Sequence, residues 1–291
     1  MFKGAILKIG DKVKHRTRPE FGIGQVLEIT DDASCTVEFE RARFSGVSID
    51  AFATIEQLET ESREAERRKE REGQQLRALE ERKRKYEIDE QARANSEIVE
   101  QFNRRGVRSL WYIAHSDNIT KILRHGILNH HDASRLEPNR VDISDPEAQR
   151  WREETDPHFG RRIHTYSPLY LKPRNPMLYV RRHLRDHLCL IEVDLSVIFN
   201  SEYLITDGNA ASRLTKFYKS VEDIDKLPWD VLNSAYWPDY DDGKRKMCAE
   251  VLVYPKIDSK YISTLHCYSS NTKMRLGDCG RMVEVSPKLF F

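Results

Sequence analysis

The chain has 291 residues, of which 39% are apolar, 9% aromatic and 33% charged. These proportions allow at least one ordinary hydrophobic core, and the charged fraction indicates one unusually solvated segment. With 48 basic and 47 acidic side chains the formal net charge is +1, which excludes a global positive field. Any surface for a nucleic acid must therefore be local.

The cysteines contain no Cys-x-x-Cys pair, which argues against a zinc ribbon and a secreted disulfide scaffold. We interpret all five as reduced thiols of a cytoplasmic protein: Cys35, Cys189, Cys248, Cys267 and Cys279. Residues 1–15 lack the apolar core of a signal peptide, and no stretch is long enough to span a bilayer. We expect neither membrane association nor a metal site.

Residues 8–57 have the pattern of a small β structure. The strings VKH, GQVLEI and CTVEFE predict strands, and the turn signals RPEFGIG and TDDAS separate them. Short strands and tight turns suggest an SH3-like barrel over residues 1–57. The string GDKVKHRTRPEFGIGQVLEI also resembles KOW and Tudor-like modules, which implies docking to a protein or a nucleic acid. A barrel that only caps the following helix is the alternative.

The next segment, residues 58–100, accounts for the high charge content. Between Glu61 and Glu90, 20 of 30 residues are charged, ten of each sign. A core cannot be built from this composition, but strong helix formers and acid–base pairs at four-residue spacing predict a long solvated helix, with Gly73 as a weak point. Because a sustained apolar seam is missing, a spacer is favoured over a dimeric coiled coil.

Residues 101–291 mix predicted strands and helices, so the fold class is α+β. Trp111–Ala114 predicts a strand, and Ser116 or Asp117 can cap a helix that Gly126 ends. The strings LCLIEVDL, at 188–195, and MCAEVLVYP, at 247–255, predict buried strands.

Glu250 is the first candidate for catalysis because it interrupts an apolar strand. A carboxylate in such a place costs several kcal/mol, about 2–7 for a polar group and more for a charge, unless partners satisfy it. In a cleft it suits a reaction that develops positive charge on a sugar. The alternative is the solvated face of an edge strand, and Glu192 shows the same pattern.

His115 ends one predicted strand and precedes a helix, so its side chain and the first helical amides can face one ligand. A packing histidine is the alternative. The loop 142–165 contains four arginines whose planar forks suit pyrophosphate, unless the loop is merely solvated: Arg150, Arg152, Arg161 and Arg162.

Rings and cations alternate in HTYSPLYLKPRNPMLYVRRH, which follows this loop. Such alternation suits stacking on bases and contact with phosphates, and a core strand with basic flanks is the alternative. The candidates for binding a nucleic acid are Tyr166, Tyr170, Lys172 and Arg174.

Several blocks in the same order resemble the DarT family of nucleic-acid ADP-ribosyltransferases. WYIAHSDNITKILRHGIL resembles the family's opening strand and helix, and RIHTYSPLYLKPRNPMLYV resembles its "L-H-D-Y-V-P-F-Y-F-x-P-R-S-P-M-L-Y" block. TDGNAA, LPWDVL and KRKMCAEVLVYP follow in the family's order. Ala114 stands where many members have Thr, and residues 1 to about 100 lie outside the resemblance.

The resemblance implies an ADP-ribosyltransferase fold, a split mixed β core with helices around a cleft for NAD. It places Glu250 on the catalytic glutamate and His115 on the histidine beside the nicotinamide-proximal ribose. Arg150, with Arg152 as second choice, falls near the essential arginine, because the preceding loop differs in length. The resemblance also implies that Asn118, Met177 and Tyr179 line the NAD cleft, with no metal.

The implied function is transfer of ADP-ribose from NAD to a base in single-stranded DNA, in a toxin–antitoxin or phage-defence system. Messenger RNA as the acceptor, plain NAD hydrolysis, and a non-catalytic nucleic-acid-binding adaptor are the alternatives. A toxic enzyme of this kind implies an antitoxin or another neutralising partner.

Overall fold

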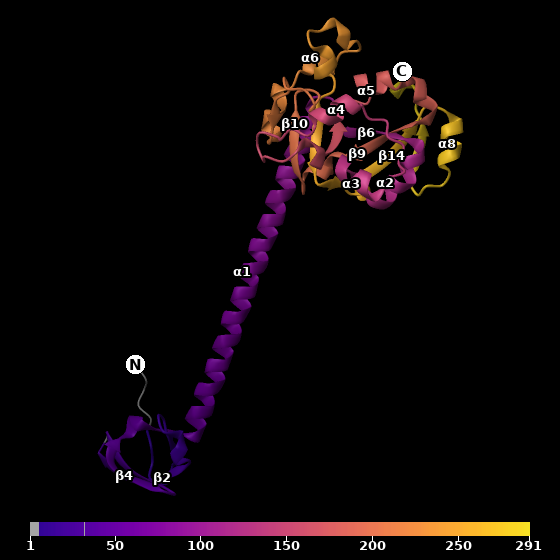
Figure 1. Ribbon diagram of the computed structural model, residues 1–291. Helices are drawn as coiled ribbons and strands as arrows, with labels where there is room; N and C mark the ends of the chain where they lie inside the picture. The colour runs from indigo at the N-terminus through magenta and orange to yellow at the C-terminus, as the bar shows by residue number, and fades with distance from the viewer. Residues whose placement is uncertain (1–5, 32) are drawn as a thin grey trace. The chain divides into compact units, whose positions relative to one another are not determined.

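A computed structural model describes residues 6–31 and 33–291. The chain divides into two compact units, unit 1 up to Asp89 and unit 2 from Glu90 (Figure 1). The turn expected in TDDAS includes Asp32, and the segment judged for a signal peptide includes residues 1–5, so both fall partly outside the described residues. A search of the described residues finds no helix with the length and apolar character needed to cross a membrane.

Unit 1 contains a five-stranded antiparallel sheet in the order β4-β3-β2-β1-β5. Its strands are β1 (Lys12–His15), β2 (Gly24–Asp31), β3 (Ser34–Phe39), β4 (Ala42–Ser48) and β5 (Phe52–Thr54). Val13, Val37 and Phe52 are buried in its core. The three predicted strands are confirmed, and β4 and β5 are additional. Exposed polar residues obscure β4 in the sequence.

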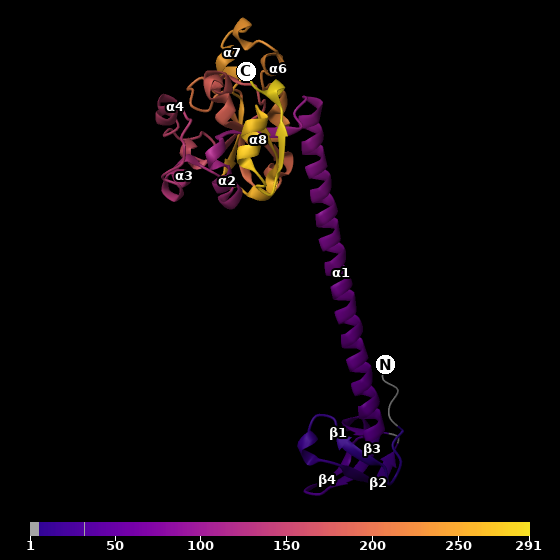
Figure 2. The same cartoon turned by 90° about the vertical axis from the view of Figure 1, so that its right-hand side faces the viewer.

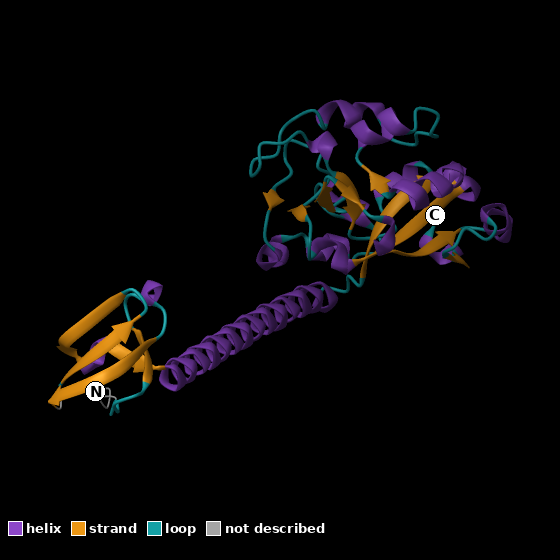
Figure 3. Cartoon of the chain, turned by 90° about the horizontal axis from the view of Figure 1, so that it is seen from below, coloured by secondary structure: helices purple, strands orange, loops and turns teal. Residues whose placement is uncertain are grey.

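Helix α1 (Ile55–Arg104) follows unit 1's sheet and runs for 50 residues without a break at Gly73 (Figure 3). Phe102, near its end, is its buried residue. Ion pairs at four-residue spacing form on the exposed surface, including Arg63–Glu59 and Arg68–Glu72. The predicted long charged helix is therefore confirmed, and it is longer than expected at both ends.

Unit 2 is built on an eight-stranded mixed sheet in the order β11-β10-β12-β8-β6-β9-β14-β15. The pairs are antiparallel except for β14 with β15, which is parallel. The strands are β6 (Ser109–His115), β8 (Ser167–Tyr170), β9 (Leu188–Asp194), β10 (Glu202–Thr206), β11 (Phe217–Tyr218), β12 (Glu250–Tyr254), β14 (Ile262–Cys267) and β15 (Met282–Val285). A small separate ladder joins β7 (Ile127–Leu128) and β13 (Lys256–Ile257).

Short helices surround this sheet, and α2 and α3 lie beside β7 (Figures 1 and 2). The α-helices of unit 2 are α2 (Ile119–His125), α3 (His130–Leu136), α4 (Pro146–Trp151), α5 (Pro176–Val180), α6 (Trp229–Leu232), α7 (Gly243–Lys246) and α8 (Ser270–Leu276). The 3-10 turns are η3 (Ser116–Asn118), η4 (Ile163–Thr165), η5 (Arg182–His187), η6 (Leu195–Ile198), η7 (Val221–Lys226), η8 (Trp237–Asp239), η9 (Ser259–Tyr261) and η10 (Pro287–Leu289). In unit 1, η1 (Pro19–Phe21) and η2 (Ile49–Ala51) complete the set.

The large sheet is nearly divided between β6 and β8. β6 pairs with β9 along all seven of its residues, but its register with β8 is a single pair, Trp111 opposite Tyr170. Tyr170 also lies opposite Glu250 on β12. β8 and β6 are therefore joined at Tyr170 and Trp111, beside the first residue of β12, and are unpaired along the rest of β6 toward His115.

The sequence predicted β6, α2 and β9 closely, but two details differ. The imidazole of His115 caps η3, the turn that leads into α2, since its Nδ1 accepts the Asp117 amide at 3.3 Å, and α2 itself has no side-chain cap from Ser116 or Asp117. β12 begins at Glu250 rather than at Met247, because the amides of residues 247–249 complete the turn of α7. Gly126 ends α2 with φ of 83° as expected.

Candidate active site

A cavity of about 320 Å³ opens at the split of the sheet. Its walls come from the end of β6, helices α2 to α5, and the loop between α3 and α4. Among the residues predicted to hold NAD, the cavity is lined by His115, Asn118, Arg152 and Met177. This volume lies at the lower end of the range for small-molecule sites, about 300–1,000 Å³.

Glu250 is fully buried and lies behind the cavity rather than in its wall. Nη2 of Arg152 donates to both of its carboxylate oxygens, at 2.8 and 2.6 Å, and the amide of Ala210 donates to Oε1 at 3.1 Å. These donors satisfy the charge that a strand interior would otherwise exclude. The edge-strand alternative is therefore wrong, since β12 lies between β10 and β8.

Arg152, and not Arg150, is the arginine at this site. Arg152 is 8% exposed and both lines the cavity and pairs with Glu250, whereas the side chain of Arg150 is exposed outside the cavity lining. Burial would lower the pKa of Arg152, but the charge and hydrogen bond of Glu250 outweigh it and raise that pKa. The first-choice placement of Arg150 is thus corrected. Arg150 lies in the last turn of α4 and Arg152 directly follows this helix. The sequence alone could not show which of the two side chains reaches Glu250.

The other arginines of the 142–165 loop point elsewhere. Arg161 binds the carboxylate of Glu202 at 3.1 Å and stacks over Tyr254, and Arg162 is exposed. The cations that do line the cavity besides Arg152 include Arg140 and Arg181. Of the four loop arginines, Arg152 therefore lines the cavity and the other three do not.

His115 lies at the mouth of the split with 9% of its surface exposed. Because Nδ1 accepts the Asp117 amide, we assign the hydrogen of the neutral ring to Nε2, which is left to donate. Burial lowers the pKa of His115, and the nearby charge of Asp117 opposes that shift. The ring stacks on His187 with centroids 5.7 Å apart.

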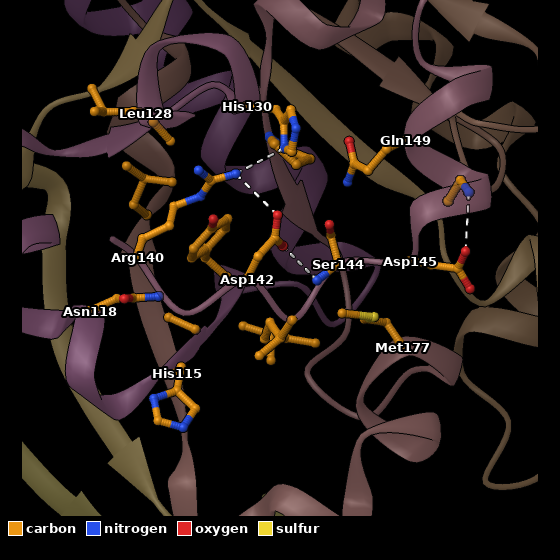
Figure 4. A pocket seen from close by; sticks show the side chains of 18 of the residues that line it. His115, Asn118, Leu128, His130, Arg140, Asp142, Ser144, Asp145, Gln149 and Met177 are labelled. Atoms are coloured by element: carbon orange, nitrogen blue, oxygen red, sulfur yellow. Dashed lines mark hydrogen bonds and ion pairs between the residues drawn. The ribbon is translucent and has the colours of Figure 1, made fainter. Parts of the chain in front are cut away.

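Asn118 shapes the cavity by fixing a loop. Its Nδ2 donates to the carbonyl of Val141 at 2.8 Å and its Oδ1 accepts the Val141 amide at 3.0 Å. Figure 4 shows the next groups along this loop, where Arg140 reaches toward both His130 and Asp142. Burial and the charge of His164 lower the pKa of His130.

Two buried polar atoms beside these groups have no hydrogen-bond partner, Gln149 Oε1 and His164 Nδ1. Both residues line the cavity. Nε2 of His164 is within 2.6 Å of the Gln149 carbonyl, so its other ring nitrogen is the free one. A buried polar atom without a partner costs about 1–3 kcal/mol, so a polar ligand that reaches these atoms gains from satisfying them.

The buried wall next to Glu250 is kept uncharged. Burial and the charge of Glu250 raise the pKa of Tyr170 well above its usual range, and they raise the pKa of Cys248 to about 12. Burial, followed by the charge of Asp142, raises the pKa of Tyr112. Tyr112, Tyr170 and Cys248 therefore stay neutral, and the ion pair beside them is that of Arg152 and Glu250.

Several residues with predicted roles lie away from the positions that those roles need. Tyr179 is 43% exposed and lies outside the cavity lining, so its contact with NAD stays a prediction that the cavity does not support. Tyr166 lines the cavity but is 1% exposed and donates its hydroxyl to Asp156, so it cannot stack on a base in solvent. Lys172 is half-buried and donates to Asn233, whereas Tyr170 lines the cavity. Arg174 is exposed.

Glu192, whose sequence pattern matched that of Glu250, has a different setting. It accepts the Ser109 hydroxyl at 2.6 Å, pairs with His266 at 3.2 Å and lies outside the cavity lining. The cavity residues that sequence reasoning missed include a polar set from short helices and the loops beside them: His130, Arg140, Asp142, Gln149, His164 and Arg181. The paired histidines at 130 and 131 were the available signal.

Within residues 6–31 and 33–291, no three His, Cys, Asp or Glu side chains are grouped so that they could hold a metal ion.

The fold and the site together define the class of domain. Unit 2 is an α+β domain in which a buried carboxylate–guanidinium pair lies behind a polar cavity at a split sheet.

Comparisons with known proteins define the class further. The fold of unit 2 matches the solved structure "Thermus sp. 2.9 DarT in complex with ADP-ribosylated ssDNA", with a TM-score of 0.58 and 21% identity over 64% of this chain and 97% of that one. It also matches "Thermosipho africanus DarTG in complex with ADP-ribose", with a TM-score of 0.56 and 33% identity over 63% of this chain and 51% of that one. The fold expected from the sequence is thus confirmed for this unit.

The family model described as "ssDNA thymidine ADP-ribosyltransferase, DarT" matches residues 111–291, and the chain belongs to this family. A Thermosipho africanus DNA ADP-ribosyl transferase–DNA ADP-ribosyl glycohydrolase fusion protein is 34% identical over 193 residues, 63% of this chain. The chain spans only 50% of that fusion protein. A Thermus sp. DNA ADP-ribosyl transferase is 26% identical over 55% of this chain and 81% of its own length.

Proposed function

We propose that this chain is an NAD-dependent ADP-ribosyltransferase that modifies a base in single-stranded DNA. The observation that carries the proposal is the buried pair of Glu250 and Arg152 behind a cavity lined by His115, all within the residues that match the DarT family model. Solved DarT proteins from Thermus sp. 2.9 have been captured with NAD+ and with ADP-ribosylated single-stranded DNA, and the DarTG of Thermosipho africanus with ADP-ribose.

The residues of the cavity fit NAD as the substrate. The dinucleotide carries two anionic phosphates and two riboses, and the cavity offers cationic and neutral donors for both kinds of group. Nε2 of His115 can donate to a ribose hydroxyl, while Arg152 or Arg140 can bind a phosphate. Gln149 Oε1 and His164 Nδ1 are free to accept hydrogen bonds. Met177 supplies an apolar wall.

The reaction breaks the bond between the nicotinamide nitrogen and ribose C1′, and the bonding electrons leave with neutral nicotinamide. Positive charge develops on the ribose, and Glu250, which lies behind the cavity wall in its pair with Arg152, is the carboxylate proposed to stabilise it. A base nitrogen then forms the new bond to C1′ with its lone pair, and its proton passes to Glu250 or to water. The residues proposed for catalysis are Glu250, Arg152 and His115.

The test is incubation of the full chain with radiolabelled NAD and matched DNA and RNA oligonucleotides. We expect label on single-stranded DNA, and none with Glu250→Gln. Label on RNA alone would make messenger RNA the acceptor, and free ADP-ribose without labelled acceptor would make the enzyme a glycohydrolase. No consumption of NAD under any condition would leave a non-catalytic adaptor and would refute the proposal.

We further propose the division into an SH3-like module (1–57), a charged helical linker (58–100) and a transferase domain (101–291). The five antiparallel strands of unit 1 and the family match from residue 111 support it. We also propose a cytoplasmic location, supported by five free thiols.

A neutralising partner is proposed as well, in keeping with a toxin–antitoxin or phage-defence role. The Thermosipho relative carries a DNA ADP-ribosyl glycohydrolase in the same polypeptide, which supports a partner that removes the modification. Co-expression of such a glycohydrolase should restore growth to cells that the full chain inhibits. Growth inhibition that persists despite complete removal of ADP-ribose from DNA would contradict this role.

A further inference from the structure

Three aromatic rings from distant segments meet beside helix α5. Tyr179 of α5, Trp237 of η8 and Phe291 at the end of the sequence have ring centroids 5.3–6.0 Å apart in pairs, with interplanar angles of 79–87°. Figure 1 shows the end of the chain beside α5. We call Tyr179, Trp237 and Phe291, together with Arg174 and Arg182, the aromatic platform.

The platform is open to solvent. Tyr179 is 43% exposed, Trp237 and Phe291 are half-buried, and the neighbouring Tyr236 is 62% exposed. Rings of this size favour burial, so a cluster left exposed marks a binding surface more often than a single exposed ring does. Edge-to-face packing fixes the rings against one another, which lowers the entropy cost of using them to bind.

Two arginines lie on this cluster. The guanidinium of Arg174 is 4.5 Å from the centroid of Phe291, and that of Arg182 is 4.2 Å from the centroid of Tyr179. Arg182 also donates to the carbonyl of Tyr179 at 2.9 Å. Among the described residues no carboxylate pairs with either arginine, in contrast to Arg104 and Arg105, which have acidic partners. The platform therefore carries positive charge that a polyanion can neutralise.

The platform is continuous with the cavity through α5. Met177 and Val180 of this helix line the cavity, and Tyr179 between them belongs to the platform. Arg181, which follows α5, lines the cavity while its Nε donates to the carbonyl of Ile143. A chain molecule with one unit in the cavity can therefore continue directly onto the rings.

We propose that the aromatic platform binds the nucleotides that flank the modified base in a single strand, with bases stacked on Tyr179 and Trp237 and phosphates held by Arg174 and Arg182. Alternating rings and unpaired cations fit a polymer with flat apolar faces and regular negative charge. A single-stranded nucleic acid exposes the faces of its bases, whereas a duplex buries them between neighbouring base pairs. This assignment deepens the proposed function and rests on it. It replaces Tyr166 as the stacking residue and gives Tyr179 a role outside the NAD site.

The test measures binding by fluorescence anisotropy in the full chain with Glu250→Gln, so that no modification occurs during titration. The probes are labelled single strands of about 4 and about 15 nucleotides and a duplex of the longer sequence. The variants are Tyr179→Ala, Trp237→Ala and the double change R174E/R182E. Matched controls are Tyr86→Ala, an exposed ring on α1, and R108E/R281E, which makes the same change in charge away from the platform.

We expect the platform variants to raise the Kd for the long single strand about tenfold or more, since one stacked base is typically worth about 1–3 kcal/mol. R174E/R182E should also flatten the dependence of log Kd on log salt by roughly 0.7 for each phosphate that is no longer neutralised. The controls should bind like the parent, and the duplex should bind more weakly than the strand. Circular dichroism and the shift in Tm caused by NAD check that each variant is folded. If Trp237→Ala unfolds, Tyr179→Ala still tests the platform, because Tyr179 is exposed.

Equal Kd values for platform variants and controls, or equal affinity for strand and duplex, would overturn the platform. A separate labelling assay uses the chain and the platform variants with Glu250 intact. If that chain labels DNA from NAD while folded platform variants do so equally well, the platform fails and the transferase activity stands. If it labels nothing but strand binding disappears in the platform variants, the transferase activity fails and the platform stands.

Discussion

Arg152 and Glu250, 98 residues apart in the sequence, form a buried ion pair in which one guanidinium nitrogen donates to both carboxylate oxygens. The pair closes the space between the loop after α4 and the first residue of β12. A buried charge without its partner costs about 3–5 kcal/mol. The two side chains thus stabilise the domain and, in the proposed function, act in the chemistry.

The first prediction separates these two roles at Glu250. Glu250→Gln keeps the shape of the side chain and an acceptor for the Ala210 amide, but removes the negative charge. We expect transfer from NAD to fall by at least about 10²–10³-fold, the usual loss when an electrostatic stabiliser is removed. Single-turnover assays with labelled NAD measure it. Glu250→Ala is a poorer probe, because it leaves Arg152 buried without a partner and should lower the free energy of unfolding.

The second prediction compares two neighbouring arginines. Arg152→Ala leaves Glu250 buried and unpaired, and we expect it to lower the free energy of unfolding by about 3–5 kcal/mol. Arg150→Ala removes an exposed side chain and should change it by no more than about 0.5 kcal/mol. Urea denaturation followed by circular dichroism measures both. Similar midpoints for the two variants would contradict the assignment of Arg152.

The sequence was sufficient where a pattern is local. An apolar strand that ends in His115 and a helix closed by Gly126 followed from residue order, and the structure has both. The buried carboxylate of Glu250 was also expected, but it lies at the first residue of β12 rather than inside a strand. The choice between Arg150 and Arg152 was not local. The two lie in the same short stretch, and only the approach of β12 shows which one meets Glu250.

Contacts between distant segments explain the remaining misses. Tyr166 and Tyr179 belong to one stretch of alternating rings and cations, yet the first is buried against Asp156 and the second is exposed beside Trp237. The loop carrying Arg140 and Asp142 joins the cavity because Asn118 binds the Val141 backbone. No periodicity in the sequence encodes such a contact.

The third prediction concerns this loop. Asn118→Ala removes both hydrogen bonds to Val141, each typically worth about 0.5–1.5 kcal/mol. The loop should become mobile, and the KM for NAD should rise severalfold while kcat changes little, because Glu250 and Arg152 are untouched. Steady-state kinetics at varied NAD measures the change. A loss confined to kcat would instead place Asn118 in the chemical step.

The fourth prediction is a dependence of stability on pH. Burial lowers the pKa of His115 and of His130 below the ordinary value of 6.5. The unfolded chain therefore binds more protons than the folded one between the lowered pKa values and 6.5. We expect the free energy of unfolding to be highest above pH 6.5, to fall as the pH drops below it, and to level off below the folded pKa values. Urea midpoints from about pH 5 to 8 measure it, and the double change H115Q/H130Q should flatten the curve.

The fifth prediction contrasts two glycines in opposite settings. Gly126 ends α2 at a φ of 83°, and a Cβ there would lie 2.2 Å from the carbonyl oxygen of Ile257. Gly126→Ala should therefore destabilise unit 2 by more than about 1 kcal/mol, since both the backbone angle and the space oppose a side chain. Gly73 lies in the exposed interior of α1, where a Cβ would come no nearer than 3.9 Å to the end of Arg77, so Gly73→Ala should stabilise the helix by about 1 kcal/mol. Thermal melts at a far-ultraviolet wavelength that reports helix should shift in opposite directions for the two variants. If Gly73→Ala also lowered the Tm, the prediction would fail, because an unbroken helix such as α1 has no bend that requires glycine.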